Sequence, residues 1–388
     1  MFIFGEALRE YPTFVGGRVA DLKYWIGFNL VPGIGPARLR ALLEHFGDLE
    51  SAWQAEAREL REAGLDRRSL ESLISTRKEI SLEEEEAKVA QVGAKAITWE
   101  DENYPPRLRH IHNPPPLLYV KGEILPRDEW AVAVVGTRNP SHYGKQVVDQ
   151  IAGDLARNGI TVISGLARGI DSLAHRAALE AGGRTIAVLG SGIDIIYPAE
   201  HTKLAQAIVE EGALVTEYPL GTPPEGGNFP PRNRIISGLG LGSVIVEAGE
   251  RSGALITADY TLEQGRELFA VPGNIVARKS RGTNRLIQEG GAKLILSVED
   301  IMEELNLTMI EEHREVQEIL PENETESTIL GLISQEPVHV DEIGRQSGLP
   351  IAQVTSTLAL MELKGLVRQV GGMNYVLARE AKVRYVVD

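Results

Sequence analysis

The chain has 388 residues, a formal net charge of −15 at pH 7 and no cysteine. The length predicts two or three domains, and the lack of cysteine excludes disulfides, thiolate metal sites and cysteine nucleophiles. Because the sequence has neither an apolar run of membrane-spanning length nor a signal-peptide pattern at its start, we expect a cytoplasmic protein.

Residues 1–90 are expected to form an N-terminal helical domain of the SAM or helix-hairpin-helix type. Their most distinctive segment reads Asn29-Leu-Val-Pro-Gly-Ile-Gly-Pro-Ala-Arg38. Gly33 and Gly35 permit a tight turn there, and Pro36 suits the first position of a second helix. Such hairpins either present backbone N–H groups to DNA phosphate or only pack helices together, and the sequence leaves both open.

Residues 91–310 are predicted to form an extended Rossmann-like α/β domain with a connector. The connector holds two short strands, 96–99 and 117–120, and its prolines at 105–106 and 114–116 predict an extended path without helix. From Ala131 onward, short apolar runs alternate with helix-length amphipathic segments, which is typical of a parallel sheet covered on both faces. The runs are Ala131–Val135, Thr161–Ile163, Thr185–Leu189, Ala213–Thr216, Ser243–Val246, Leu268–Val271 and Lys293–Leu296.

Residues 311–326 are acidic and poor in large apolar side chains, so we expect a linker there. Residues 327–388 are predicted to form a winged-helix domain. Its expected elements are helices at 329–334, 340–347 and 351–364 and a hairpin of 366–370 with 373–377. The third helix begins without a basic residue, so the sequence favours a protein contact over DNA binding for this domain.

Glycine-rich loops follow five of the predicted parallel strands, and ligands bind at the carboxyl ends of such strands. Glycine lets backbone N–H groups approach an anion, and a following helix adds a positive dipole. The loops begin at Gly136, Ser164, Gly190, Glu247 and Pro272. They favour an extended anion-binding track. The first turn lacks G-x-G-x-x-G and no P-loop occurs, so we expect no nucleotide cofactor.

Two basic segments stand out near this track. The first contains Phe229, Arg232, Asn233 and Arg234. Arginine suits phosphate, and an aromatic ring can stack on a base; alternatively, the arginines are structural and pair with Glu217 or Glu247. The second segment, residues 278–285, carries four basic residues and is either a DNA contact or a solvated loop.

The net acidity of the chain does not exclude such a track. Residues 131–296 carry 16 basic residues (Lys and Arg) and 16 acidic residues (Asp and Glu). Residues 297–388 carry 7 basic and 17 acidic residues. The predicted Rossmann-like domain is therefore neutral overall and has room for a local basic surface.

One cluster resembles a catalytic site at first sight. Asp171 and His175 lie four residues apart on a predicted helix, with Ser164 and Ser172 nearby in the sequence. We expect Asp171 to cap its helix and His175 to pack or hydrogen bond, because no known catalytic or metal-binding motif surrounds them.

Several motifs occur in the order typical of one family. They are Gly136-Thr137-Arg138, Ser164-Gly165 with Gly169-Ile170-Asp171 and His175, Pro230 through Ile235, Ser252 through Ala258, Val271-Pro272-Gly273, and Gly282-Thr283-Asn284. With them the chain resembles the DprA (Smf) family of DNA-processing proteins. The resemblance implies a homodimer, joined through the Rossmann-like domain, that binds single-stranded DNA by its phosphate backbone. It also implies protection of incoming DNA and loading of RecA in natural transformation and homologous recombination, with no catalytic activity. The absence of cofactor and metal motifs in the sequence predicts neither a cofactor nor a metal.

Within the resemblance, Arg138 corresponds to the family's phosphate-binding arginine, Arg232 and Arg234 to its basic pair, and Arg251 to a position that is often basic. The residues expected to contact DNA are Gly136, Thr137, Arg138, Ser164, Gly165, Arg168, Gly190, Phe229, Arg232, Asn233, Arg234, Arg251, Ser252, Gly253, Gly273 and Asn274.

The sequence offers less support for two other functions. A phosphoribohydrolase of similar fold would carry P-G-G-x-G-T-x-x-E after a strand, but the comparable segment here reads Glu247-Ala-Gly-Glu-Arg-Ser-Gly-Ala. A transcription factor acting through the winged helix would need basic residues on the third helix. Both alternatives are less well supported than DNA binding by the central domain.

Overall fold

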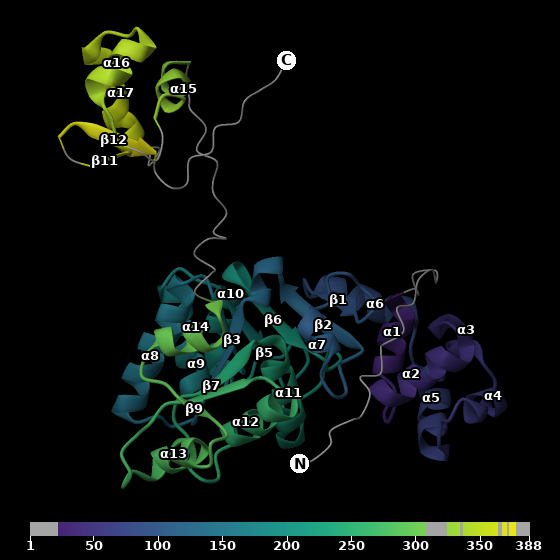
Figure 1. The fold of residues 1–388 in the computed structure, drawn as a ribbon. Coiled ribbons are helices and arrows are strands. Elements are labelled where there is room, and N and C mark those ends of the chain that lie inside the picture. The colour runs from purple at the N-terminus through teal and green to yellow at the C-terminus, as the bar shows by residue number, and fades with distance from the viewer. Residues whose placement is uncertain (1–21, 308–323, 334–336, 364–366, 371, 378–388) are drawn as a thin grey trace, which may run out of the picture. The chain divides into compact units, whose positions relative to one another are not determined.

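The computed structural model describes residues 22–307, 324–333, 337–363, 367–370 and 372–377 (Figure 1). The chain divides into two compact units between Asn306 and Leu307. None of the helices in these ranges is long and apolar enough to cross a membrane.

Within the described residues, six helices precede the first strand: α1 (Leu22–Asn29), α2 (Pro36–Phe46), α3 (Leu49–Gln54), α4 (Ala57–Glu62), α5 (Arg67–Glu79) and α6 (Leu82–Gln91). The predicted hairpin joins α1 to α2, with Gly33 at a φ of +88° and α2 starting at Pro36. The carbonyl of Gly33 accepts hydrogen bonds from Arg38 and from Ser69 of α5. The hairpin is therefore fixed by contacts within the helical region.

These helices share a hydrophobic core with the sheet. Trp25 of α1 is 1% exposed and meets Trp99, just after β1, edge to face at 5.8 Å between ring centroids. Tyr119 of β2 donates a hydrogen bond to the side-chain oxygen of Asn29 at 3.1 Å. The helical region thus packs directly on the strands of the connector.

Nine strands form one sheet in the order β1-β2-β6-β5-β4-β3-β7-β8-β9. They are β1 (Lys95–Thr98), β2 (Leu117–Gly122), β3 (Ala131–Val135), β4 (Thr161–Ser164), β5 (Thr185–Val188), β6 (Ala213–Thr216), β7 (Gly242–Ile245), β8 (Glu267–Ala270) and β9 (Lys293–Leu294). The seven strands from β3 to β9 are parallel, as predicted. The connector strands extend the sheet at the β6 edge, where β2 pairs with β6 antiparallel.

The chain builds this sheet in two directions from β3. It first moves outward to β6 through α8 (His142–Arg157), α9 (Ile170–Glu180) and α10 (Thr202–Glu211). It then returns through α11 (Phe229–Leu239) to β7 and continues through α12 (Ala254–Glu263) and α13 (Arg281–Gln288). Right-handed crossovers place the two groups of helices on opposite faces (Figure 1). The strand order reverses between β3 and β7, which is where open α/β sheets bind ligands.

The expectation that prolines exclude helix from the connector is wrong at one point. A short helix, α7 (Pro106–Arg109), starts at the second of two adjacent prolines. Proline is well suited to the first helical position because the N–H that it lacks has no partner inside the helix there.

The second unit is a winged helix. Its helices are α15 (Glu324–Leu330), α16 (Val340–Ser347) and α17 (Ile351–Leu363), and its sheet has the order β10-β12-β11. The strands are β10 (Val338–His339), β11 (Val367–Gln369) and β12 (Asn374–Leu377). Helix α15 starts five residues before the predicted helix and includes the end of the predicted linker; the rest of that linker, 311–323, lies outside the described residues.

Candidate functional site

The glycine-rich loops lie along one edge of the sheet because they follow the parallel strands β3, β4, β5, β7 and β8. This carboxyl edge is where the sequence predicted a track for phosphate. The loops do lie together at this edge, as predicted. The groups that remain available to a ligand differ from those that the sequence predicted.

Several backbone N–H groups expected to hold phosphate already have partners inside the protein. The amide of Thr137 donates to the carbonyl of Glu247 at 2.7 Å, and the amide of Gly165 donates to Asp171 at 3.1 Å. The amide of Gly273 donates to the side chain of Asn284 at 3.0 Å. The first bond joins the loops after β3 and β7, and the other two hold a loop to the helix that follows it, so ligand binding at this edge has to rely more on side chains.

The loop after β3 presents Arg138 to solvent. The loop itself is tightly packed: a Cβ on Gly136 would lie 2.6 Å from Ile170, and the amide of Ile170 donates to Thr137. Arg138 is exposed and forms no ion pair with any residue that the structure describes. The tight Gly-Thr turn therefore fixes the point from which an unpaired cation reaches outward.

Arg138 is accompanied by two aromatic rings. Its guanidinium carbon lies 5.5 Å from the ring centroid of Phe229, and the ring of Tyr197 lies 5.8 Å from that of Phe229 at a tilt of 33°. A Cβ on Gly190 would lie 2.7 Å from Phe229, so glycine makes room for this ring. We call Arg138, Tyr197 and Phe229 the Arg138 platform. Sequence reasoning missed Tyr197, which follows no motif and comes from the loop after β5.

Arg232 lies beneath the platform instead of on the surface. It is 3% exposed, and its Nη1 donates to the carbonyls of Gly165, at 2.7 Å, and Val188. Burial lowers the pKa of Arg232 to about 10, an effect that nearby Asp171 opposes. The guanidinium carbon also lies 5.8 Å from the Phe229 ring centroid. Arg232 therefore joins the ends of β4 and β5 and supports Phe229, and its buried guanidinium does not reach a phosphate in solvent.

Arg234 matches the structural alternative. Its Nη1 and Nη2 donate to the two carboxylate oxygens of Glu217 at 2.5 and 2.6 Å, and its Nε donates to the carbonyl of Asn113. Burial acts to lower the pKa of Arg234, but its hydrogen bonds to the Glu217 carboxylate and the charge of that carboxylate more than offset it, and the net shift is upward. This arginine is committed to the protein interior, and its neighbour Asn233 is half-buried.

Other expected site residues remain at the carboxyl edge with different degrees of access. Arg168 is exposed and forms a bidentate ion pair with Glu200 at 2.7 and 2.8 Å. Exposed ion pairs are worth at most about 1 kcal/mol, so phosphate can replace this partner. Arg251 is exposed and forms no ion pair in the described part of the chain, and Gly253 and Asn274 are also exposed.

The hydroxyl groups near this edge are less accessible. Ser164 is fully buried and donates to the carbonyl of Val134 at 2.7 Å. Ser252 is half-buried, and its amide donates to Gly249 at 3.0 Å. Ser164 therefore holds β4 to β3 in this arrangement and does not face a ligand.

The Asp171 and His175 cluster is structural. Gly169 is the N-cap of α9, so Asp171 does not cap the helix as expected; its carboxylate accepts from the amide of Gly165 and closes the loop after β4. His175 is fully buried with Nδ1 2.6 Å from the hydroxyl of Thr185. That hydroxyl donates to Val162, so Nδ1 is the protonated nitrogen. Its Nε2 is buried and has no hydrogen-bond partner in the described structure.

The burial of His175 predicts a specific pH dependence of stability. Burial lowers its pKa to about 3, whereas an unfolded histidine has a pKa of about 6.5. Between these values only the unfolded chain binds the proton, so the contribution of His175 to stability is present above about pH 6.5 and is lost as the pH falls. Its loss amounts to about 1.4 kcal/mol per pH unit. Urea unfolding should show that the wild type loses its advantage in free energy of unfolding over His175→Gln as the pH falls from 7 to 5. A constant difference would contradict this placement.

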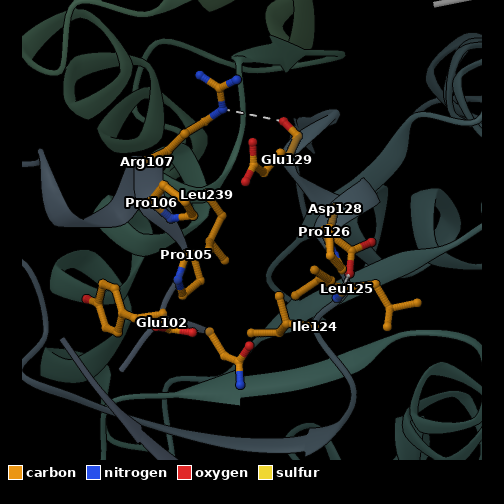
Figure 2. A pocket seen from close by; sticks show the side chains of 13 residues that line it. Glu102, Pro105, Pro106, Arg107, Ile124, Leu125, Pro126, Asp128, Glu129 and Leu239 are labelled. Atoms are coloured by element: carbon orange, nitrogen blue, oxygen red, sulfur yellow. Dashed lines mark hydrogen bonds between the residues drawn. The ribbon is translucent and has the colours of Figure 1, made fainter. Parts of the chain in front are cut away.

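The opposite edge of the sheet carries a separate cavity of about 130 Å³. Its lining includes Pro105, Pro126, Asp128 and Glu129, and Figure 2 shows Arg107 hydrogen bonded to the backbone carbonyl of Glu129. Residues 126–129 directly precede β3, so the cavity lies at the amino ends of the strands. Its prolines and carboxylates make it unsuited to a nucleic-acid phosphate.

Comparisons with known proteins cover most of the chain. The family model described as DNA recombination-mediator protein A matches residues 95–306, and the DprA winged helix domain matches residues 314–373. Protein Smf of Synechocystis is 36% identical across 92% of this chain and 98% of that protein. DNA processing protein DprA of Bacillus subtilis is 46% identical across 55% of this chain and 72% of that protein.

Two solved structures share the fold. The X-ray structure of DNA processing protein A from Streptococcus pneumoniae has a TM-score of 0.65 at 34% identity and covers 74% of this chain and 98% of that chain. A structure that concerns the single-stranded DNA binding mode of the Helicobacter pylori protein has a TM-score of 0.50 at 31% identity. It covers 55% of this chain and 96% of that chain. From the matched residues, the relatives and the shared fold, the chain belongs to the DprA/Smf family of DNA-processing proteins.

Proposed function

We propose that this protein binds single-stranded DNA along the carboxyl edge of its nine-stranded sheet. The observation that carries the proposal is the Arg138 platform, in which an exposed guanidinium lies beside the rings of Phe229 and Tyr197. A cation for phosphate next to rings for bases is how proteins bind single strands without reading much sequence. The single-stranded DNA binding mode described for the Helicobacter pylori relative supports the same ligand.

Two further exposed cations lie in loops at the same edge and extend the binding surface beyond the platform. Arg168 follows β4 and Arg251 follows β7, so both lie in carboxyl-edge loops. The amides of Gly136, Gly190 and Gly253 and the side chain of Asn274 are further candidates for contact. In this proposal Arg232 and Arg234 act indirectly, by holding Phe229 and helix α11 in place.

The proposal includes protection of incoming DNA and loading of RecA onto the strand, in natural transformation and homologous recombination. Membership in a family described as recombination mediators supports this role. A homodimer through the Rossmann-like domain fits the edge strand β9, near which Leu262, Leu294 and Leu296 are 46, 42 and 76% exposed. An apolar sheet edge is a surface that pairs readily with another chain.

Equilibrium titration tests the proposal with a labelled single strand of about 20 nucleotides and its duplex, monitored by fluorescence anisotropy. We expect at least tenfold tighter binding of the single strand, because only unpaired bases can stack on the platform. Light scattering of the protein without DNA should give the mass of two chains. Equal affinity for both forms, or no binding at all, would overturn the proposal.

A further inference from the structure

A second feature of the carboxyl edge lies where the strand order reverses. An open pocket of about 480 Å³ is lined by the start of α8, by Glu247 after β7 and by the loop after β8. We call it the switch-point pocket. Its volume falls within the range of small-molecule sites, roughly 300–1,000 Å³. It shares Asn274 with the DNA track proposed above, but the rest of its lining has no role there.

The pocket contains a buried carboxylate with spare capacity to accept hydrogen bonds. Glu247 is 3% exposed, and its Oε2 accepts from the amide of Ser141 at 2.8 Å, at the N-cap of α8. A Cβ on Gly144 would lie 2.7 Å from Oε2, so glycine makes room for the carboxylate. No cation pairs with Glu247 and no donor reaches its Oε1 among the residues that the structure describes. Oε1 is not among the described buried side-chain atoms that lack a partner, so it faces the open pocket and is free to accept from a ligand.

The remaining walls suit a nucleotide. Tyr143 is 46% exposed, and its hydroxyl donates to the carbonyl of Pro272 at 2.8 Å, which fixes the ring at the pocket. Arg278 is exposed and Lys279 half-buried, and both line the pocket. The pocket therefore combines an aromatic ring, cations for phosphate and one buried acceptor, a set that fits a nucleobase on a phosphate backbone.

The pocket is close enough to the Arg138 platform for one strand to use both. Arg138 and Ser141 lie in the same loop, three residues apart, and three residues span at most about 11 Å. A strand held at Arg138 thus reaches the pocket within a few nucleotides.

Resting on the proposed function, we propose that the switch-point pocket takes one base of the bound single strand and prefers guanine. In a single strand the Watson–Crick edge is free to be read. Guanine presents two adjacent donors there, N1–H and the N2 amino group, to the carboxylate of Glu247. Adenine and cytosine present one amino group each. Thymine presents one N–H between two carbonyls, which the carboxylate repels.

The first test compares strands of about 20 nucleotides: thymidine alone, thymidine with isolated guanosines, and the same strand with inosine, which lacks the amino group. Anisotropy titrations of the wild type should give about fivefold or tighter binding for the guanosine strand, with inosine intermediate. Equal affinities for all three would overturn the inference. Failure to bind any of them would instead overturn the proposed function.

Glu247→Gln tests the acceptor directly. The amide oxygen still accepts from Ser141, while the amide nitrogen replaces Oε1 with a donor. The affinity for the guanosine-containing strand divided by the affinity for the thymidine strand should fall to about one, while the thymidine strand still binds. Glu250→Gln is the matched control, since Glu250 lies in the same loop, is exposed, and approaches Arg281 at 4.0 Å instead of lining the pocket. A ratio that survives Glu247→Gln, or falls equally in both variants, would contradict the inference.

Tyr143→Leu gives a second test that leaves the carboxylate untouched. Loss of the ring should weaken binding of the guanosine-containing strand more than binding of the thymidine strand. Tyr143→Phe keeps the ring and should keep most of the preference for guanosine. Circular dichroism melting of both variants separates lost stacking from lost fold. An unchanged guanosine preference in a folded Tyr143→Leu protein would rule out a base in this pocket.

Discussion

Arg138→Ala is expected to weaken binding of single-stranded DNA by about 10- to 100-fold. A hydrogen bond between a charged arginine and phosphate contributes about 1.5–3 kcal/mol, and each 1.4 kcal/mol is a factor of ten. The effect should be large because Arg138 is exposed and has no ion pair in the described structure that would compete with phosphate. The ring of Phe229 should also lose the cation that lies 5.5 Å from its centroid. Anisotropy titration of a labelled single strand measures the change.

Arg157→Ala is the matched control for this prediction. Arg157 is the last residue of α8, so it lies toward the opposite edge of the sheet, and its side chain is 60% exposed. Removing this arginine takes away the same charge from the same domain and should change the affinity less than twofold. If Arg138→Ala and Arg157→Ala weaken binding equally, the site assignment is wrong and only net charge matters.

Glu217→Ala is expected to have the largest effect on folding, a loss of about 3–5 kcal/mol in the free energy of unfolding. The side chains of Glu217 and Arg234 are 17 and 10% exposed, so the substitution leaves a buried guanidinium without its carboxylate. The pair also connects distant segments. Arg234 donates to Asn113 of the connector, and the backbone carbonyl of Glu217 accepts from Asn29 of the N-terminal helices.

Replacing both partners of the pair distinguishes the cost of an unpaired buried charge from the cost of a lost contact. Urea unfolding should show the double variant with Glu217→Met and Arg234→Met to be more stable than Glu217→Ala, because it leaves no unpaired buried charge. Glu200→Ala is the control, since Glu200 pairs with Arg168 at a similar distance but is 55% exposed and should cost at most about 1 kcal/mol. Similar losses at Glu217 and Glu200 would contradict the importance of burial.

The parallel strands were predictable from sequence because each is a short, continuous apolar run between glycine loops. The predicted start of β3 at Ala131 and the whole of β6 agree with the structure. The antiparallel pairing of β2 with β6 was not predictable, since four apolar residues at 117–120 carry no information about strand direction. The loops after the strands were expected at one edge, and parallel pairing brings them there.

The roles of individual arginines were not predictable in the same way. Arg232 and Arg234 lie two residues apart on α11, and the resemblance implied that both contact DNA, although a structural pairing with Glu217 or Glu247 was left open. Both arginines are buried because α11 packs against β3, β4 and β5 on one side and against α7 and α12 on others. Only tertiary packing reveals this, and it also brings Tyr197 beside Phe229. Arg138 was singled out by the glycine turn after the first parallel strand and by the family resemblance. The structure shows it exposed, and its role in binding stays a prediction.

The salt dependence of single-strand binding tests the central claim most directly. If the carboxyl edge holds the phosphate backbone, the logarithm of the affinity falls linearly with the logarithm of salt concentration, by about 0.7 for each phosphate contact. Contacts from Arg138 and the exposed cations Arg168 and Arg251 predict a slope near −2 for the wild type, and Arg138→Ala should reduce its magnitude by about 0.7. Binding that is independent of salt, or a slope unchanged by Arg138→Ala, would contradict the account.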